Sequence, residues 1–202
     1  MLQTIADAIW AQPCLAYHVQ PSLEPETRSA FAKVQEAFDK LWPEPLHLGP
    51  GHGLHVTIYP LATVKEGYDK EVYWQSIEPQ CRGILNDLCV GHRALELRFS
   101  RLKVTDTAII ATATEETGLI EAIRERIVRE VPSPPGQKPI IYDLIHSTLA
   151  RYRTDAAIPK DVVERVEALP VAITAPVKQI RLVRETLFPC LETDEMAAFP
   201  LR

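Results

Sequence analysis

The chain has 202 residues, 46% of them hydrophobic and 24% charged, which is the composition of a soluble globular protein with room for a full core. Its 27 acidic residues outnumber its 22 basic ones, and a formal charge of −5 argues against broad non-specific binding to DNA or RNA. We find no apolar run as long as a membrane span and no basic start before Asp7, so we expect a cytoplasmic protein without a membrane segment or signal peptide.

The first part of the chain, approximately residues 1–94, alternates strand-like and helical patterns. A glycine-containing loop separates the first helix from the next strand, and Pro79 predicts a break in the second helix. The elements expected in order are a strand at 14–20, a helix at 25–42, a strand at 54–61 and a helix at 71–91.

The second part, approximately residues 95–202, also alternates strand-like and helical patterns. It begins with a predicted hairpin whose turn contains Thr105 and Asp106. The elements expected are strands at 94–104 and 107–113, a helix at 117–131, a strand at 140–152, a helix at 159–169 and a last strand at 177–187. No long flexible linker interrupts the pattern, so we expect residues 1–202 to form one bilobed domain.

Two strand-like segments carry the same histidine–threonine pair. His55 and Thr57 lie in HVTIYP, and His146 and Thr148 lie in HSTLAR; we call these four residues the motif tetrad. Residues at i and i+2 of a β-strand point to the same face, so each pair presents an imidazole beside a hydroxyl. Two such pairs facing one another would supply an acid, a base and two hydroxyls, a sufficient set for splitting a phosphodiester without a metal ion.

Each predicted motif strand has one polar, aromatic face and one mostly apolar face. Tyr59 shares the face of the first pair, and Tyr142 and Tyr152 share the face of the second. Because polar groups are costly to bury without partners, we expect both faces to line a wet groove between two sheets. The alternative is that each face is the solvated outer side of a sheet.

The segments HVTI and HSTL resemble the paired motifs of the two-histidine phosphoesterases, a superfamily that includes bacterial RNA 2′,3′-cyclic phosphodiesterases, often called 2′-5′ RNA ligases. The likeness covers nearly the whole chain. CLAYHVQP resembles the opening strand of that superfamily, LELRFSRLKV its middle segment, and VKQIRLVRETL its closing strand before a short terminal coil. The resemblance implies an α+β fold in which two pseudo-symmetric antiparallel sheets, flanked by helices, surround a central cleft lined by both motifs.

The resemblance also implies roles for the motif tetrad. His146 would be the base and His55 the acid in opening a cyclic phosphate, and Thr57 and Thr148 would donate hydrogen bonds to the non-bridging oxygens. Histidine suits both proton-transfer roles because its unperturbed pKa lies near neutrality. Members of the superfamily typically work without a metal ion, so we expect no cofactor.

Four further residues are candidates for substrate binding. Tyr59, Tyr142 and Tyr152 could stack a base or contact phosphate, although ordinary packing explains each equally well. Arg151 is a cation beside the second motif, but regular alternation places it on the face opposite His146. A bend or bulge would be needed to turn it into the site.

A metal site is the competing interpretation of His47, His52 and His55. Their spacing matches no standard zinc pattern, and neither a cysteine nor a carboxylate completes the set. The four cysteines also lack metal-ligand spacing, and we expect free thiols in a reducing compartment. We therefore predict no metal ligands.

Three functions stay open at this stage. The first is a metal-independent phosphodiesterase that opens a cyclic nucleotide or RNA-terminal 2′,3′-cyclic phosphate, or cleaves a 2′-linked phosphodiester. The second is a phosphodiesterase or ligase for another small phosphodiester, and the third is a non-catalytic nucleotide-binding module with the same cleft. We expect a monomer that binds a small nucleotide or an RNA terminus, with no long duplex and no membrane as partner.

Overall fold

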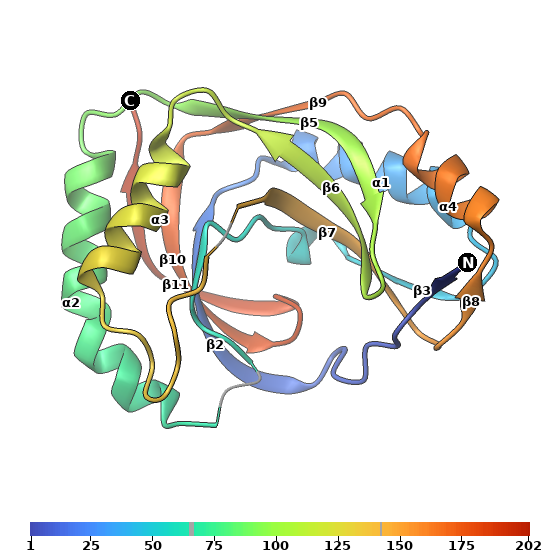
Figure 1. Cartoon of the computed structure of the whole chain (residues 1–202). Coiled ribbons are helices and arrows are strands. Elements are labelled where there is room, and N and C mark those ends of the chain that lie inside the picture. The colour runs from blue at the N-terminus through green and yellow to red at the C-terminus, as the bar shows by residue number, and fades with distance from the viewer. Residues whose placement is uncertain (65–66, 142) are drawn as a thin grey trace.

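The computed structural model describes the chain except residues 65–66 and 142, and it has the predicted α+β fold (Figure 1). The helices are α1 (Pro25–Asp39), α2 (Lys70–Cys89), α3 (Leu119–Glu130) and α4 (Lys160–Glu167), with a 3₁₀ turn, η1, at Gly51–Gly53. The strands are β1 (Leu2–Gln3), β2 (Pro13–Pro21), β3 (Leu46–Leu48), β4 (Tyr59–Ala62), β5 (Leu95–Val104), β6 (Ala108–Thr114), β7 (Ile145–Tyr152), β8 (Ala157–Ile158), β9 (Ile173–Val177), β10 (Gln179–Leu187) and β11 (Glu192–Pro200).

Two antiparallel sheets carry the fold. The four-stranded sheet has the order β11-β10-β2-β4, and the five-stranded sheet has the order β3-β7-β6-β5-β9. Strands β1 and β8 form a small separate ribbon. Each large sheet takes strands from both the earlier and the later part of the chain, so the two parts are interleaved around the centre of the molecule.

Helices cover one face of each large sheet. On the four-stranded sheet, Tyr17 of β2 stacks on Trp74 of α2 with ring centroids 4.6 Å apart, and α3 packs beside α2 (Figure 1). On the five-stranded sheet, Phe99 of β5 meets Phe31 of α1 edge-on at 4.9 Å, and α4 packs on β5. Because side chains alternate along a strand, the neighbours of Tyr17 and Phe99 point away from these helices.

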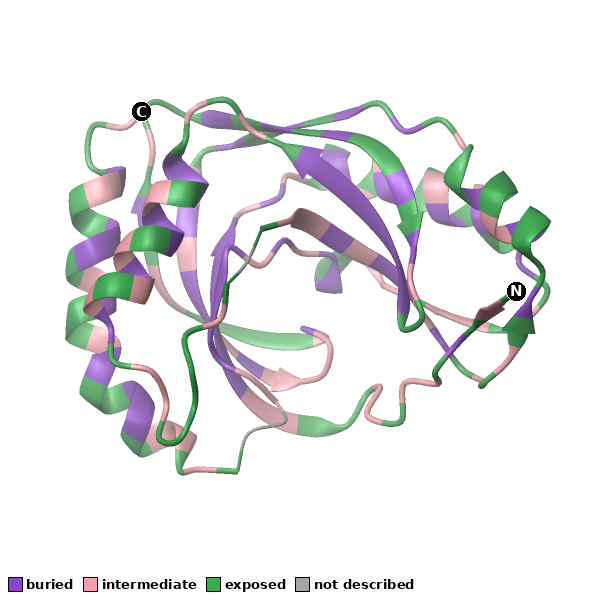
Figure 2. Ribbon diagram, viewed as in Figure 1, coloured by how far each residue is buried: buried purple, intermediate pink, exposed green. Residues whose placement is uncertain are grey.

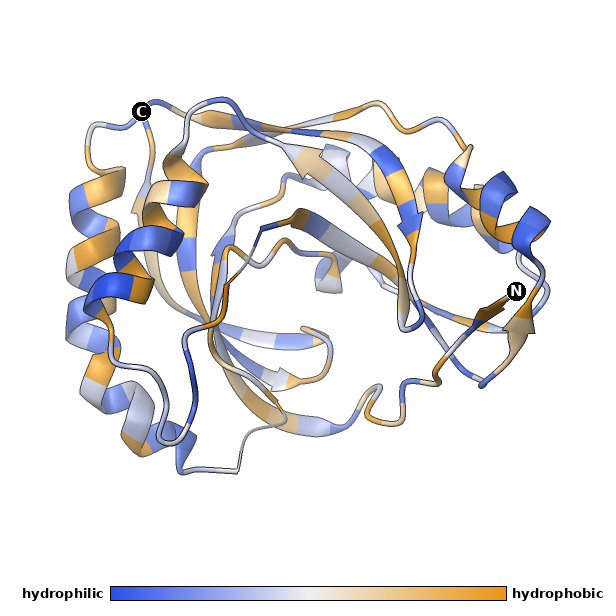
Figure 3. Ribbon diagram, viewed as in Figure 1, coloured by the Kyte–Doolittle hydropathy of each residue, from blue (hydrophilic) through white to orange (hydrophobic). Residues whose placement is uncertain are grey.

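The hydrophobic core follows from this layering. The helices carry a buried stripe and an exposed one (Figure 2), and the buried stripe coincides with their hydrophobic residues (Figure 3). In α1, Phe31 and Phe38 are 0% exposed, and they continue the apolar surface of the five-stranded sheet. No helix in the described part of the chain is long and apolar enough to cross a membrane.

Most predicted elements are confirmed, and three predictions are wrong. Helix α2 continues through Pro79. Proline has no amide hydrogen, so one carbonyl of the preceding turn loses its helical hydrogen bond, and this carbonyl lies on the solvent-exposed side of the helix. The predicted terminal coil is instead the edge strand β11, whose largely exposed residues lack apolar alternation. The predicted strand at 54–61 is reduced to β4 at Tyr59–Ala62, preceded by an extended segment that contains most of the first motif.

Candidate active site

The two histidine–threonine pairs meet at a single antiparallel bridge between Val56 and Ser147. Both bridging residues are 0% exposed, so their side chains lie on the core face. By alternation the motif tetrad lies on the other face, and its four members are all only partly buried. In this register His55 stands opposite Thr148 and Thr57 opposite His146, which places the two histidines diagonally, roughly 7 Å apart at Cβ.

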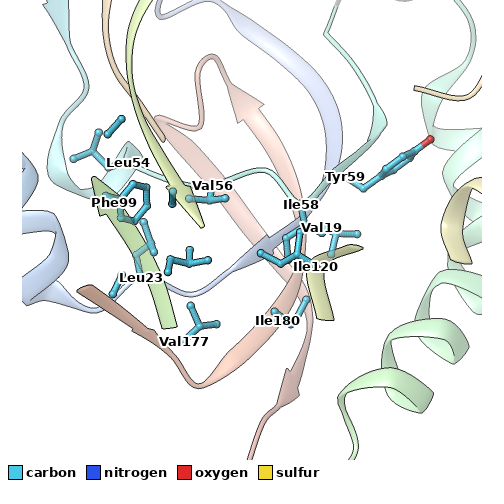
Figure 4. Close-up of a cluster of buried hydrophobic side chains, with 14 of the residues drawn as sticks. Val19, Leu23, Leu54, Val56, Ile58, Tyr59, Phe99, Ile120, Val177 and Ile180 are labelled. Atoms are coloured by element: carbon cyan, nitrogen blue, oxygen red, sulfur yellow. The ribbon is translucent and has the colours of Figure 1, made fainter. Parts of the chain in front are cut away.

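The first motif is held by core packing on its apolar side. Leu54, Val56 and Ile58 lie in a buried cluster with residues of both large sheets (Figure 4). The amide of Ile58 donates to the carbonyl of Val19 in β2 at 2.8 Å, after which the chain joins the four-stranded sheet as β4. The motif therefore crosses from one sheet to the other, and this crossing explains why it does not form the long regular strand that alternation predicts.

The lead-in to the first motif is anchored on β7. Gln35 of α1 donates to the carbonyl of Gly49 at 2.8 Å and to that of Leu149 at 2.7 Å. A Cβ at Gly49 would lie 2.9 Å from Leu54 Cδ2 and 3.4 Å from the Leu149 carbonyl oxygen, so a larger residue would push the Leu54 side chain aside. The glycine-rich loop thus fixes the position of the first motif against the second.

Arg124 of α3 joins the two motifs at their other end. Its side chain is buried, and its guanidinium donates to the carbonyl of Ile58 and to the carbonyl of Leu144, each at 2.9 Å. Ile58 directly follows the first pair, and Leu144 directly precedes β7. One buried cation therefore bridges the backbones of both motif segments.

His55 is held in one orientation. Its Nδ1–H donates to the carbonyl of Gly53 at 2.7 Å, which leaves Nε2 as the acceptor of the neutral ring. Burial lowers the pKa of His55 to about 4, and the nearby positive charge of Arg151 acts in the same direction. The Gly53 carbonyl and the Glu185 carboxylate oppose this change, because both favour the imidazolium.

His146 lies among cations. Burial lowers its pKa, and the guanidinium groups of Arg124 and Arg151 lower it further. Its cross-strand partner in β6 is Thr112, which is itself buried. The neutral imidazole is therefore favoured at His146.

Arg151 enters the site through a β-bulge, which corrects the expectation from regular alternation. β7 pairs Thr148 with Ile110 and Ala150 with Ile109, so Leu149 is the extra residue and reverses the phase of the strand beyond it. Arg151 consequently shares the face of the motif tetrad. Its guanidinium lies 3.3 Å from the Asp7 carboxylate and 4.9 Å from the Phe188 ring centroid.

Two exposed cations of β5 extend the same face. Arg101 and Lys103 each pair with a β6 residue, and that β6 residue pairs in turn with a tetrad residue of β7. The two rows are Arg101–Thr112–His146 and Lys103–Ile110–Thr148. Arg101 also donates to the Thr112 hydroxyl at 3.3 Å. The motif face is thus locally basic on a chain that is acidic overall.

A narrow pocket is lined by Trp10 together with two tetrad residues, His55 and Thr148. The indole stacks on His47 of β3, with ring centroids 4.6 Å apart and planes inclined by 6°. The lining residues are Trp10, Gly49, Gly53, His55, Thr148, Leu149, Ala150 and Pro189. Sequence reasoning did not single out Trp10, which lies far from both motifs in the chain.

Crystal structures of other proteins match this fold over almost its whole length. A Thermus thermophilus protein, TT0787, matches with a TM-score of 0.65 at 21% identity, covering 93% of this chain and 98% of that one. Escherichia coli LigT with 3′-AMP matches with a TM-score of 0.59 at 15% identity, covering 94% of this chain and 99% of LigT. A protein described as a phosphoesterase also gives a TM-score of 0.59, at 15% identity and 92% and 98% coverage. The chain has the two-histidine phosphoesterase fold. No protein-family model and no curated protein sequence matches it.

Within this two-histidine phosphoesterase fold, two of the candidate tyrosines lie away from the tetrad. Tyr152 is 1% exposed, stacks on Trp42 and donates to the carbonyl of Thr105, so it is a core residue that cannot contact substrate. The bulge at Leu149 moved it to the core face. Tyr59 is buried in β4 and accepts a hydrogen bond from the Ile140 amide at 3.3 Å. Tyr142 lies outside the described residues.

The histidine trio of the lead-in does not gather around a point. His52 is exposed on η1, His47 stacks on Trp10, and His55 belongs to the tetrad. Within the described part of the chain, the one group with metal-ligand geometry is a different one, formed by His18, Glu185 and Cys190. Sequence spacing gave no sign of this group, because β2, β10 and the turn after β10 contribute one residue each.

Proposed function

We propose that the chain is a metal-independent phosphodiesterase that opens a 2′,3′-cyclic phosphate at a nucleotide or RNA end. The Val56–Ser147 bridge carries this proposal, because it sets both histidine–threonine pairs on one face in antiparallel register. In this proposal the two imidazoles and two hydroxyls on that face contact one phosphate group. One chain supplies all four groups, so a monomer is sufficient.

His146 is the base in this proposal. A neutral imidazole is needed to take a proton from the attacking water, and both neighbouring guanidinium groups favour the neutral form of His146. The same guanidinium groups, from Arg124 and Arg151, attract the phosphate. Thr57 and Thr148 donate to the non-bridging oxygens, where negative charge grows in the transition state.

His55 is the acid. Its Nε2 delivers a proton to the leaving ribose oxygen, so the imidazolium must form when substrate is bound. The Glu185 carboxylate favours that form, and an anionic phosphate against the ring favours it further. Of the two histidines, His55 is therefore the one whose neighbours include a carboxylate that supports the positive charge.

The substrate side is suited to a nucleotide or a short RNA end. Trp10 offers an aromatic surface next to the tetrad pocket, and Arg101 and Lys103 provide a short run of positive charge. LigT, which shares the fold, has been crystallised with 3′-AMP, phosphate and ATP. An acidic chain with so few local cations fits a terminal phosphate better than a long duplex.

A hydrolysis screen in EDTA tests the proposal. The panel contains 2′,3′-cyclic mononucleotides, RNA with a 2′,3′-cyclic end, 2′-5′ oligonucleotides and a small non-nucleotide cyclic phosphate. We expect turnover of the first two substrates without added metal. Turnover of the last substrate alone would indicate another small phosphodiester, and nucleotide binding without turnover would indicate a binding module. Activity that EDTA abolishes and metal restores would contradict the mechanism.

The pH dependence gives a second prediction. Both histidine pKa values are lowered in the free site, so both rings are neutral at pH 7 and the required imidazolium is scarce. Because kcat/KM reports the free enzyme, we expect it to peak on the acidic side of pH ~6.5 and to fall as pH rises to 8. Bound phosphate raises both pKa values, so kcat should peak at a higher pH than kcat/KM. A kcat/KM profile that still rises at pH 8 would contradict these assignments.

A further inference from the structure

A buried cluster of three metal-ligating side chains lies beside His55. His18 comes from β2, Glu185 from β10 and Cys190 from the turn after it, and all three are buried. One ligand atom from each lies within 4.8 Å of the other two. The acid–base mechanism proposed above uses none of the three as a proton-transfer group.

The ligand atoms of this cluster are already oriented. Glu185 Oε2 lies 2.7 Å from His18 Nε2, and Glu185 Oε1 accepts from the Cys190 amide at 2.7 Å. Gln20 Nε2 points at Cys190 Sγ at 3.4 Å. Such outer hydrogen bonds are what orient carboxylate and thiolate ligands in metal sites. His18 Nδ1 has no hydrogen-bond partner among the described residues, so no acceptor outside the cluster fixes this ring.

His55 lies next to this cluster without belonging to it. Its Nε2 lies 3.5 Å from Cys190 Sγ. The His18–Glu185 pair is closer than two zinc ligands, which would stand about 3.4 Å apart, so the ion would replace their hydrogen bond.

We propose that His18, Glu185 and Cys190 bind one Zn²⁺ ion, and that the positive ion inhibits the enzyme because it lies beside the imidazole of His55. Binding displaces the thiol proton of Cys190 and the proton shared by His18 and Glu185, and both protons leave to solvent. A thiolate and a carboxylate then balance the two positive charges of the ion, as a buried site requires. Mixed nitrogen, oxygen and sulfur ligands favour zinc over magnesium or calcium.

Metal titration of the full chain tests the site without any assay of activity. We expect one Zn²⁺ per chain in competition with a chromogenic zinc indicator, and this binding should be lost in Cys190→Ser and in Glu185→Gln. Cys14→Ser is the matched control, since Cys14 is a partly buried thiol of β2 that lies 3.9 Å from the Glu185 carbonyl oxygen and does not belong to the cluster. Circular dichroism checks that each variant is folded.

Cobalt provides a measurement on the unaltered chain. Co²⁺ in the proposed site should give the charge-transfer absorption of a thiolate–cobalt bond in the near ultraviolet, and excess Zn²⁺ should remove it. Absence of stoichiometric zinc binding, cobalt binding without the thiolate band, or undiminished zinc binding by folded Cys190→Ser would each overturn the site.

A second experiment measures inhibition of turnover by zinc, and it rests on the proposed function. One equivalent of Zn²⁺ should abolish cyclic phosphate opening, and EDTA should restore it fully. Zinc that binds at the cluster without slowing turnover would overturn the inhibition and leave the metal site standing. If no substrate is turned over in EDTA, the proposed function fails, while the titration and the cobalt spectrum still decide the metal site.

Discussion

Alanine at His55 or at His146 is expected to lower kcat for cyclic phosphate opening by about 10²–10⁴-fold, the usual contribution of one general acid or base. In the proposed mechanism each imidazole transfers one proton, and alanine removes the group that transfers it. Valine at Thr57 or Thr148 should cost less, because the second hydroxyl and water still donate to the phosphate oxygens. The measurement is kcat in EDTA, for each variant against the unaltered chain.

His52→Ala is the matched control, since this imidazole is exposed on η1 close to the first motif. We expect its kcat to equal that of the unaltered chain. Full activity in both His55→Ala and His146→Ala would place the chemistry outside the motif tetrad, whatever the substrate screen shows.

A substrate with a better leaving group distinguishes the proposed acid, His55, from the proposed base, His146. A p-nitrophenyl phosphodiester departs without protonation, so loss of the general acid matters less for it than for a ribose ester. We therefore expect His55→Ala to retain much more of its activity on the p-nitrophenyl ester than His146→Ala does. The reverse pattern would assign the acid to His146 and the base to His55.

The periodicities that sequence reasoning uses are local, and they succeeded where the structure is locally regular. Amphipathic stripes located α1 and α3, and the alternating runs before and after Thr105 located the hairpin of β5 and β6. The spacing of the two motifs placed each histidine beside its threonine. That the pairs meet at the Val56–Ser147 bridge depends on contacts far apart in the chain, and the sequence only suggested it through the repeated motif.

The predictions that were wrong about the motif strands assumed that side chains alternate regularly along each strand, and the structure interrupts that alternation at two places. One extra residue at Leu149 reverses the phase of β7, which brought Arg151 into the site and buried Tyr152 in the core. The first motif changes sheets between Val56 and Tyr59, so its alternation does not continue into β4. Each departure adapts the strands to a site formed where the two sheets meet.

Arg124 shows a different limit. Helical period places it on the same stripe as Ile120, Ile123 and Ile127, but an arginine on such a stripe reads as a solvated residue at the edge of the helix. Its partners are backbone carbonyls, which carry no residue-specific signal. Only the assembled structure reveals that its guanidinium joins Ile58 to Leu144.

Arg124→Met should therefore impair both stability and catalysis. We expect the free energy of unfolding to fall by about 2–4 kcal/mol, because each buried carbonyl left without a donor costs about 1–3 kcal/mol. Arg129→Met on the same helix is the control. Arg129 is exposed and pairs only with Glu130 among the described residues, so its loss should change stability by no more than about 0.5 kcal/mol. Urea unfolding of the three proteins measures both differences.

The pH profile distinguishes a positioning role from simple loss of stability. The Arg124 guanidinium lowers the pKa of His146, so its removal should raise that pKa and move the acidic limb of the kcat/KM profile to higher pH. Arg124→Lys keeps the charge but cannot reproduce both hydrogen bonds of the planar guanidinium, so it should lose stability while leaving the acidic limb in place. A limb that stays fixed in folded Arg124→Met would mean that Arg124 acts on the fold alone. If the acidic limb shifts in Arg124→Met but not in Arg124→Lys, the charge of Arg124 controls the pKa of His146, the proposed base.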